Sequence, residues 1–314
     1  MTDEAPKEFA EVMRGMIDRE RNLYELAELF PQKRRDPAGF LGSLWCPACE
    51  ESALALVGGT VRCEGCGETF PVRDRVIDFR PGSGDRGKWE GLNEQFLKYH
   101  RSLSVYTLLN GAPINNYVSA RSGIGELSDV RVLDVGGGTG HVLGTFFRYP
   151  ETIDYTLLDP NLRLLHDQFV RLYPALSRLP MSHVLGFAET LPFREGTFDV
   201  VMSISSIDHF RDYGKFVKSA HRVLAPGGRL LISSHLDIAS DVEPTSRWRR
   251  LFTSSTLERV ARRAYFRKHR VGDDDHTYHF EDTVDIARSM TDAGFTVRRD
   301  ETFSRYFLVV GEKA

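Results

Sequence analysis

The chain has 314 residues, of which 41% are hydrophobic and 27% are charged, and its formal net charge at pH 7 is −3. This composition is typical of a soluble globular protein, and the length suits two or three structural units rather than one small domain. A net charge this small excludes a strong overall attraction to nucleic acid or to anionic membranes. The sequence has no apolar run of the ~20 residues that a membrane helix needs. Residues 1–4 are not those of a signal peptide, so we predict a cytoplasmic protein.

Residues 1–40 are predicted to form an N-terminal helical segment, because apolar residues from Phe9 to Phe30 recur at helical spacing and Pro31 ends the pattern. This helix either packs on the rest of the chain or forms a dimer contact.

All four cysteines lie between residues 46 and 66, in Cys46-Pro-Ala-Cys49 and Cys63-Glu-Gly-Cys66, with thirteen residues between the pairs. Two such pairs at this separation can surround one tetrahedral Zn²⁺ with four thiolates. Disulfides are the alternative, but a cytoplasmic protein keeps its thiols reduced. We therefore predict a zinc ribbon over residues 41–80. Its metal is structural, because four cysteine ligands leave no open position for water.

A short apolar stretch, residues 131–135, leads directly into a glycine cluster. The stretch is rich in β-branched residues, as buried strands are, and residues 141–147 return to helical spacing. Strand, glycine turn and helix in this order are how an open α/β sheet binds a nucleotide-like ligand. Asp134 precedes Gly136, Gly138 and Gly140 in a spacing that differs from the dinucleotide fingerprint. The carboxylate favours a cationic ligand without phosphate.

Three further motifs follow in order. Residues 156–159 predict a second strand that ends at Asp159, where a carboxylate would bind ribose hydroxyls. Residues 186–193 and 197–201 predict a loop and a strand, and residues 221–232 predict a helix end, a Pro-Gly-Gly turn and another strand. With the glycine loop, this series resembles the class I S-adenosylmethionine (SAM)-dependent methyltransferases, in particular the type 11-like members.

The resemblance covers residues 131–232 and implies a Rossmann-like, doubly wound α/β sheet with an antiparallel C-terminal strand, here preceded by the small zinc ribbon and helix. It implies a methyltransferase domain over residues 81–314. The residues that it implies for SAM binding are Asp134, Gly136, Gly138 and Gly140 at the methionine end, Asp159 at the ribose, Ala188 and Glu189 near the adenine, and Ser203 after the fourth strand. Phe187 stands where many relatives have Asp, so we expect backbone atoms and stacking to contact the adenine.

Residues 203–210 follow the fourth predicted strand, beside the expected position of the methyl group. His209 can accept a proton near neutral pH, and Asp208 can orient it. We predict these two as the catalytic residues. The alternative is a histidine that only hydrogen-bonds to its own loop.

Residues 238–280 are predicted to be a basic lid, because Arg247–Arg270 holds nine Lys or Arg residues and one acid. In the superfamily this segment covers the acceptor site, so Arg263, His276 and His279 are predicted to bind an anionic or polar acceptor. A solvated helix, helix-capping residues, or a divalent metal held by the two histidines and Asp208 are the alternatives.

We therefore predict an enzyme, a SAM-dependent methyltransferase that modifies O, N or C of a small-molecule acceptor and carries structural Zn²⁺. One alternative is an rRNA or tRNA methyltransferase that uses the ribbon and the basic lid. The other is a non-catalytic SAM-binding scaffold. No oligomeric state is predicted.

Overall fold

A computed structural model describes residues 34–50, 53–81, 114–138, 140, 142–160, 180–237, 277–303 and 306–314. Its strands form one sheet in the order β1-β2-β3-β4-β7-β6-β5-β8-β9-β11-β10. Their bounds are β1 Leu54–Val57, β2 Thr60–Cys63, β3 Thr69–Arg73, β4 Val76–Asp78, β5 Arg131–Val135, β6 Asp154–Asp159, β7 Ser182–Leu185, β8 Phe198–Ile204, β9 Leu224–His235, β10 Phe295–Phe303 and β11 Tyr306–Lys313. The helices are α3 Val142–Phe146, α5 Tyr213–Val223 and α8 Val284–Asp292, with single 3₁₀ turns η2 Pro37–Gly39, η3 Leu41–Ser43, η4 Pro150–Thr152 and η7 Ile207–His209. Residues 114–122 are also helical.

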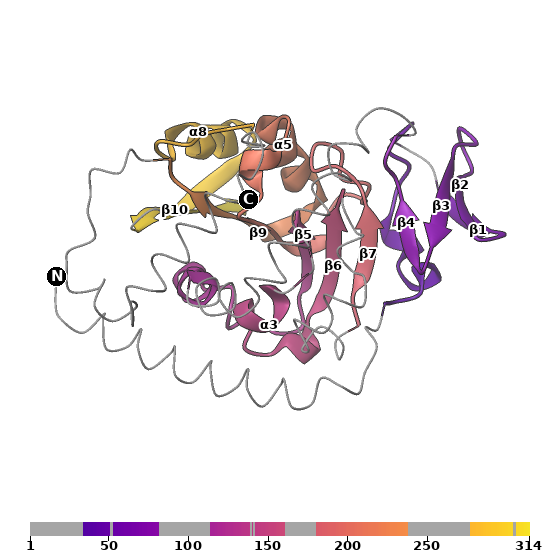
Figure 1. The fold of residues 1–314 in the computed structure, drawn as a ribbon, viewed down its shortest axis with the longest axis horizontal. Helices are drawn as coiled ribbons and strands as arrows, with labels where there is room; N and C mark the ends of the chain where they lie inside the picture. Colours follow the sequence, from indigo (N-terminus) through magenta and orange to yellow (C-terminus); the bar gives the residue numbers. More distant parts are fainter. Residues whose placement is uncertain are drawn as a thin grey trace, which may run out of the picture.

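The central strands β7, β6, β5, β8 and β9 run parallel to one another. Strand β11 lies antiparallel between β9 and β10. Helices α5 and α8 cover one face of this sheet and α3 covers the other (Figure 1). This is the doubly wound α/β sheet with an antiparallel C-terminal strand that the sequence predicts. Within the part of the chain that the structure describes, no helix has the length and apolar character to cross a bilayer.

The apolar face of α5 explains how the helix packs on the sheet. Its buried residues are Phe216, Val217, Ala220 and Val223, which share one stripe at helical spacing. They join α8 in a cluster with the sheet. The Asp212 carboxylate accepts a hydrogen bond from the Lys215 amide at 2.9 Å, which satisfies one of the unpaired amides of the first turn.

Two local predictions differ from the structure. Residues 226–228 are predicted as a turn before a strand, but they lie inside β9, where the pairing with β8 shifts register between Phe198 and Val200. Gly227 has a φ of +73° there, which glycine adopts without steric cost. The sequence also predicts a last helix over residues 280–293, where Val284, Ala287 and Met290 lie on one face. In the structure this helix begins at Val284, because residues 278–280 are not helical and the Phe280 carbonyl accepts a hydrogen bond from the Asp237 amide.

The ribbon strands continue the central sheet rather than forming a separate one. Strands β1, β2, β3 and β4 pair antiparallel in sequence order, and β4 then pairs parallel with β7. Figure 1 shows them at the β7 end of the sheet. Leu44 and Ile77 are fully buried in the cluster that also holds the residues of α5. The division into a ribbon at 41–80 and a domain at 81–314 stays a prediction, and residues 1–33 of the predicted helical segment lie outside the described residues.

The burial of β4 side chains in the same core as the central sheet leads to a prediction about stability. Replacing the fully buried Ile77 with Ala should lower the free energy of unfolding by about 2–5 kcal/mol, because it removes apolar contacts and leaves a cavity. Val57→Ala on β1, where the side chain is 56% exposed, should change it by less than about 0.5 kcal/mol. Urea unfolding of both variants measures the difference. Equal losses would show that β4 does not share the core of the sheet.

Candidate cofactor site and cysteine cluster

The glycine loop follows β5 at the edge of the sheet where the parallel strands end. Gly136, Gly138 and Gly140 have φ values of +72°, +55° and +72°, a region that side chains with a Cβ rarely enter. A Cβ on Gly136 would also lie 2.6 Å from the Cβ of Ser206. The backbone path therefore favours glycine at all three positions, and the close approach of the loop after β8 adds a second reason at Gly136.

Asp134, near the end of β5, packs against this loop from the protein interior: a Cβ on Gly137 would clash with its Oδ2. Its side chain is fully buried and accepts a hydrogen bond from the Tyr155 hydroxyl. Its second oxygen, Oδ1, has no hydrogen-bond partner among the described residues. Burial raises the pKa of Asp134 to about 7, and the charge of Asp159 adds to the increase while the Tyr155 hydrogen bond opposes it. Asp134 thus contacts the protein interior through Tyr155, and its direct contact with a ligand stays a prediction.

Asp159 ends β6 and reaches the same loop. Its Oδ2 accepts a hydrogen bond of 2.9 Å from the Gly138 amide, and the residue is 7% exposed. The structure therefore brings together the carboxylate predicted for ribose and the glycines predicted for the methionine end.

The loop after β7 carries the residues predicted to lie near the adenine. Ala188 is buried. The Glu189 carboxylate accepts hydrogen bonds from the amides of Arg211 and Asp212 at 2.8 and 3.3 Å, so this carboxylate supports the start of α5. The Arg211 guanidinium lies 4.7 Å from the ring centre of Phe187. The Phe187 ring and the Arg211 guanidinium thus lie in the loop where the sequence predicts stacking against the adenine.

Serines connect β8 and the loop after it to the end of β5. Ser203, predicted to follow the fourth strand, lies within β8. Ser203 is fully buried, and its hydroxyl lies 2.8 Å from that of Ser206. Ser206 in turn donates to the Val135 carbonyl at 3.1 Å. Ser203 therefore takes part in the buried contacts between these segments, and its contact with the cofactor stays a prediction.

Asp208 and His209, the predicted catalytic residues, lie in turn η7 at the end of this loop. The Asp208 carbonyl accepts hydrogen bonds from the amides of Thr277 and Tyr278, and its carboxylate accepts one from the Ser234 hydroxyl at 3.4 Å. The segment that carries His279 is therefore fastened to the loop that carries His209.

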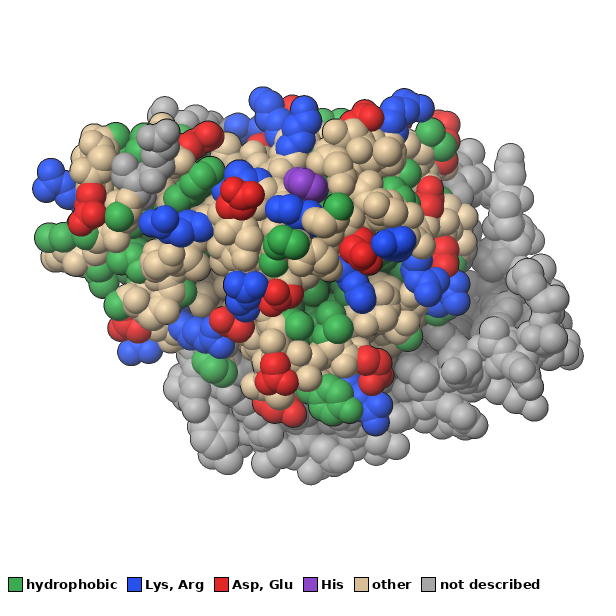
Figure 2. Space-filling view, turned by 180° about the vertical axis from the view of Figure 1, so that it is seen from behind, with side chains coloured by type: hydrophobic (Ala, Val, Ile, Leu, Met, Phe, Trp, Pro, Cys, Tyr) green, Lys and Arg blue, Asp and Glu red, His purple; other side chains and the backbone are tan. Residues whose placement is uncertain are grey.

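His279, predicted to bind the acceptor, pairs with Asp237, which the sequence analysis does not predict as a site residue. Its Nδ1 lies 3.0 Å from an oxygen of Asp237, just beyond the end of β9. His276, Arg263 and most of the predicted lid lie outside the described residues. On the face shown in Figure 2, acidic and basic side chains are interspersed rather than gathered by sign.

Tyr155 was also missed, although strand register could have indicated it. Tyr155 pairs with Val132 in the parallel β5–β6 ladder, and side chains two residues apart on a strand share a face. Tyr155 and Asp134 therefore share a face across adjacent strands. Without the register, neither residue indicates the other.

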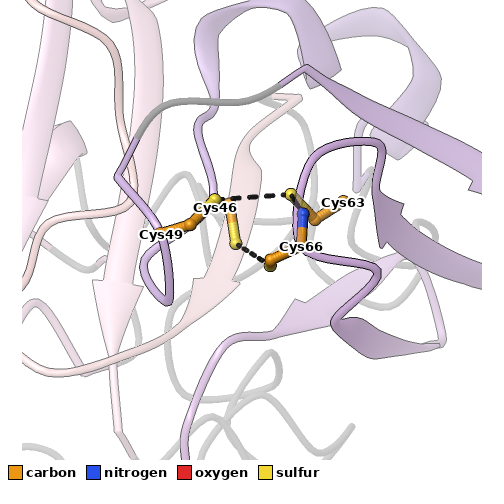
Figure 3. Close-up of side chains that lie close together, drawn as sticks. All are labelled: Cys46, Cys49, Cys63 and Cys66. Atoms are coloured by element: carbon orange, nitrogen blue, oxygen red, sulfur yellow. Dashed lines mark hydrogen bonds between the residues drawn. The ribbon is translucent and has the colours of Figure 1, made fainter.

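The four cysteines form a separate cluster in the ribbon. Their sulfur atoms all lie within 4.8 Å of one another and point toward a common centre (Figure 3). The Cys46–Cys66 and Cys49–Cys63 sulfur distances are 3.7 and 3.6 Å, and the cysteines form no disulfide. Four sulfurs bound tetrahedrally at about 2.3 Å from one zinc ion stand about 3.8 Å apart. The cluster has the donor atoms and spacing of a four-thiolate zinc site, and it is the single group of this kind in the described ranges.

The raised pKa of Asp134 predicts how stability changes with pH. The folded protein binds this proton more tightly than the unfolded chain, so the carboxyl is not destabilising below about pH 4 and becomes destabilising as the pH rises toward 7. In the Asp134→Asn variant the side chain at this position is uncharged at every pH. Above pH 7 the substitution should raise the free energy of unfolding by up to about 4 kcal/mol relative to the parent, and the gain should shrink toward pH 4.

Urea unfolding between pH 4 and 8 measures this effect. Asp285→Asn is a suitable control, because Asp285 forms an exposed pair with Arg288 on α8. A gain for Asp134→Asn that does not vary with pH would contradict the prediction.

Comparisons with known proteins show the family of this chain. A family model described as a methyltransferase domain matches residues 66–299. The ubiquinone/menaquinone biosynthesis C-methyltransferase UbiE of Haemophilus ducreyi is 33% identical over 132 residues, which are 41% of this chain and 50% of that protein. The phthiotriol/phenolphthiotriol dimycocerosates methyltransferase of Mycobacterium leprae is 30% identical over 158 residues, 49% of this chain and 54% of that protein. This chain thus spans about half the length of these relatives.

Among solved structures, a SAM-dependent methyltransferase from Aquifex aeolicus is similar, with 16% identity and a TM-score of 0.44. The match covers 74% of this chain and 100% of that chain. The family match is the broader finding, since it extends from the second cysteine pair into β10 and includes the glycine loop, Asp159 and the loop after β8. The chain therefore belongs to the methyltransferase-domain family, within the class I SAM-dependent methyltransferases that its sequence resembles.

Proposed function

We propose that the chain binds SAM at the ends of β5, β6 and β7 and transfers its methyl group to a small-molecule acceptor. The observation that carries this proposal is the Asp159 carboxylate, which lies at the end of β6 and bonds to the amide of Gly138 in the glycine loop. In a doubly wound sheet, ligands bind at this edge, beyond the carboxyl ends of the parallel strands.

The residues around this edge fit the parts of the proposed cofactor. Asp159 can exchange its bond to Gly138 for the hydroxyls of a ribose, to which a carboxylate is a strong acceptor. Phe187 and Arg211 offer a flat face of aromatic and cationic character to an adenine ring. When bound, SAM would supply a methyl group on a positively charged sulfur.

The protein's own part is to hold the acceptor in line and to take its proton where it carries one. We propose His209 as the group that takes this proton, because imidazole changes charge near neutral pH. The hydrogen bonds from Thr277 and Tyr278 to the Asp208 carbonyl hold its loop. His279, paired with Asp237, is proposed to contact a polar group of the acceptor.

The names of two relatives support a small-molecule acceptor. One is a C-methyltransferase of ubiquinone/menaquinone biosynthesis, and the other is a methyltransferase of phthiotriol dimycocerosates.

The first test offers labelled SAM to the purified protein with a small-molecule extract in one tube and total RNA in another, followed by size fractionation. We expect label in the small-molecule fraction. Label in the RNA fraction would show that the acceptor is RNA rather than a small molecule. Label in neither fraction, together with tight SAM binding, would support a non-catalytic scaffold.

Two variants separate binding from chemistry. Asp159→Asn should weaken SAM binding by about 10- to 100-fold, since it removes a charge-assisted hydrogen bond. His209→Gln should lower kcat by about 100-fold or more with an unchanged dissociation constant for SAM if the histidine is a general base. Asp285→Asn on α8 is the control for both. A kcat unaffected by His209→Gln would leave this residue a structural one.

We further propose that the cysteine cluster binds structural zinc. Soft thiolate donors select zinc, and four of them complete its tetrahedral shell without a position for water. Cys46 and Cys63 are fully buried in the same core cluster as Leu54 and Val61, so the metal would hold together a ribbon with few core residues of its own.

Metal analysis tests this directly. The purified protein is expected to contain one zinc per chain, and Cys46→Ser should remove most of it and lower the free energy of unfolding by more than about 4 kcal/mol. Ser43→Ala, just before the cluster, should retain the zinc. A zinc-free protein of unchanged stability would contradict the proposal.

A further inference from the structure

Strand β4, the last strand of the ribbon, pairs with the central sheet beside the proposed cofactor site. In β4, Ile77 pairs with Val184 and Asp78 with Leu185 of β7. Leu185 also pairs with Asp159, the last residue of β6. Asp78, Leu185 and Asp159 therefore form one row across three parallel strands. The row ends at the carboxylate proposed to bind ribose.

Arg80 follows β4 and is held in one orientation by Asp78. Its Nε and Nη2 donate to the two carboxylate oxygens of Asp78 at 2.9 and 2.8 Å, a bidentate arrangement that fixes the guanidinium plane. The two side chains are only 15% and 13% exposed. Phe79, between them, donates its amide to the Leu185 carbonyl at 2.8 Å. The guanidinium thus has a fixed position relative to β7.

The third nitrogen of this guanidinium contacts the backbone next to Asp159. Arg80 Nη1 donates to the carbonyl oxygen of Pro160 at 3.0 Å, and Pro160 follows Asp159 directly. The Asp159 carboxylate bonds to the Gly138 amide. Asp159 is therefore held on two sides: the glycine loop contacts its side chain, and the ribbon contacts the backbone that follows it.

We propose that Arg80 is a positioning residue for the cofactor site, through which the ribbon sets the placement of the ribose-binding carboxylate. This inference rests on the proposed function, because it assigns to Asp159 the binding of the ribose. It adds a role for the ribbon beyond stability. The bond from Arg80 orders the turn after β6, so the carboxylate needs less reorganisation when the cofactor binds.

The test measures the binding of S-adenosylhomocysteine by calorimetry. Arg80→Gln should raise the dissociation constant about tenfold, which corresponds to about 1.4 kcal/mol. Arg80→Lys should not restore binding, because lysine lacks the planar fork that contacts Asp78 and Pro160 together. Arg73→Gln is the matched control, since Arg73 lies exposed on β3 of the same ribbon and makes the same change of charge. It should bind like the parent.

A double-mutant cycle with Asp159→Asn distinguishes positioning from general destabilisation. If Arg80 acts through Asp159, the double variant should bind no more weakly than Asp159→Asn alone. Losses that multiply, or parent-like binding by Arg80→Gln, would overturn the proposal. Should Arg80→Gln be unfolded at the assay temperature, Asp78→Asn replaces it, because it releases the guanidinium while keeping the Arg80 donor.

The outcomes separate this inference from the proposed function. A parent protein that binds neither SAM nor S-adenosylhomocysteine would refute the proposed function. A parent and an Arg73→Gln variant that bind, beside an Arg80→Gln variant that binds equally well, would refute only the role of Arg80.

Discussion

The parallel pairing of β4 with β7 is the constraint on which the arrangement of the molecule depends. Through it the ribbon and the α/β sheet share one hydrogen-bonded ladder and one apolar cluster. Backbone ladders fix register, because a slip by one residue would turn every side chain to the opposite face. The cysteine cluster, the Asp78–Arg80 pair and the end of β6 therefore take up defined positions relative to one another.

The proposed cofactor site is built by loops that fasten each other. Ser206 from the loop after β8 bonds to the Val135 carbonyl, and Gly136 leaves the space that this serine fills. Asp159 bonds to Gly138 from the next strand. Such cross-connections keep irregular backbone ordered at a sheet edge, where ladder hydrogen bonds have ended, so that a ligand meets groups already in place.

Asp134 illustrates how the structure can add contacts to a motif residue that its local pattern does not indicate. The sequence places a carboxylate before the glycines and so favours a cationic ligand. In the structure this carboxyl is fully buried against Tyr155, with a pKa raised to about 7 by burial. Its charge is costly where it stands, and the contact that it makes is with the protein beneath the loop. Glu189 is a parallel case, since its carboxylate bonds to the start of α5.

The sequence alone determined the elements and the motifs. Local patterns located β5, β6 and β8, the glycine spacing indicated a tight turn after β5, where the structure has positive φ at Gly136, Gly138 and Gly140, and the cysteine spacing indicated the four-thiolate cluster. These features depend on residues near each other in the chain, so local patterns specify them. Tertiary structure alone decided that the ribbon joins the sheet at β7, that Tyr155 faces Asp134, that Asp237 pairs with His279, and that Arg80 reaches Pro160. Each of these contacts joins segments that strand order and register bring together. No local pattern in a single sequence indicates which distant strands lie side by side.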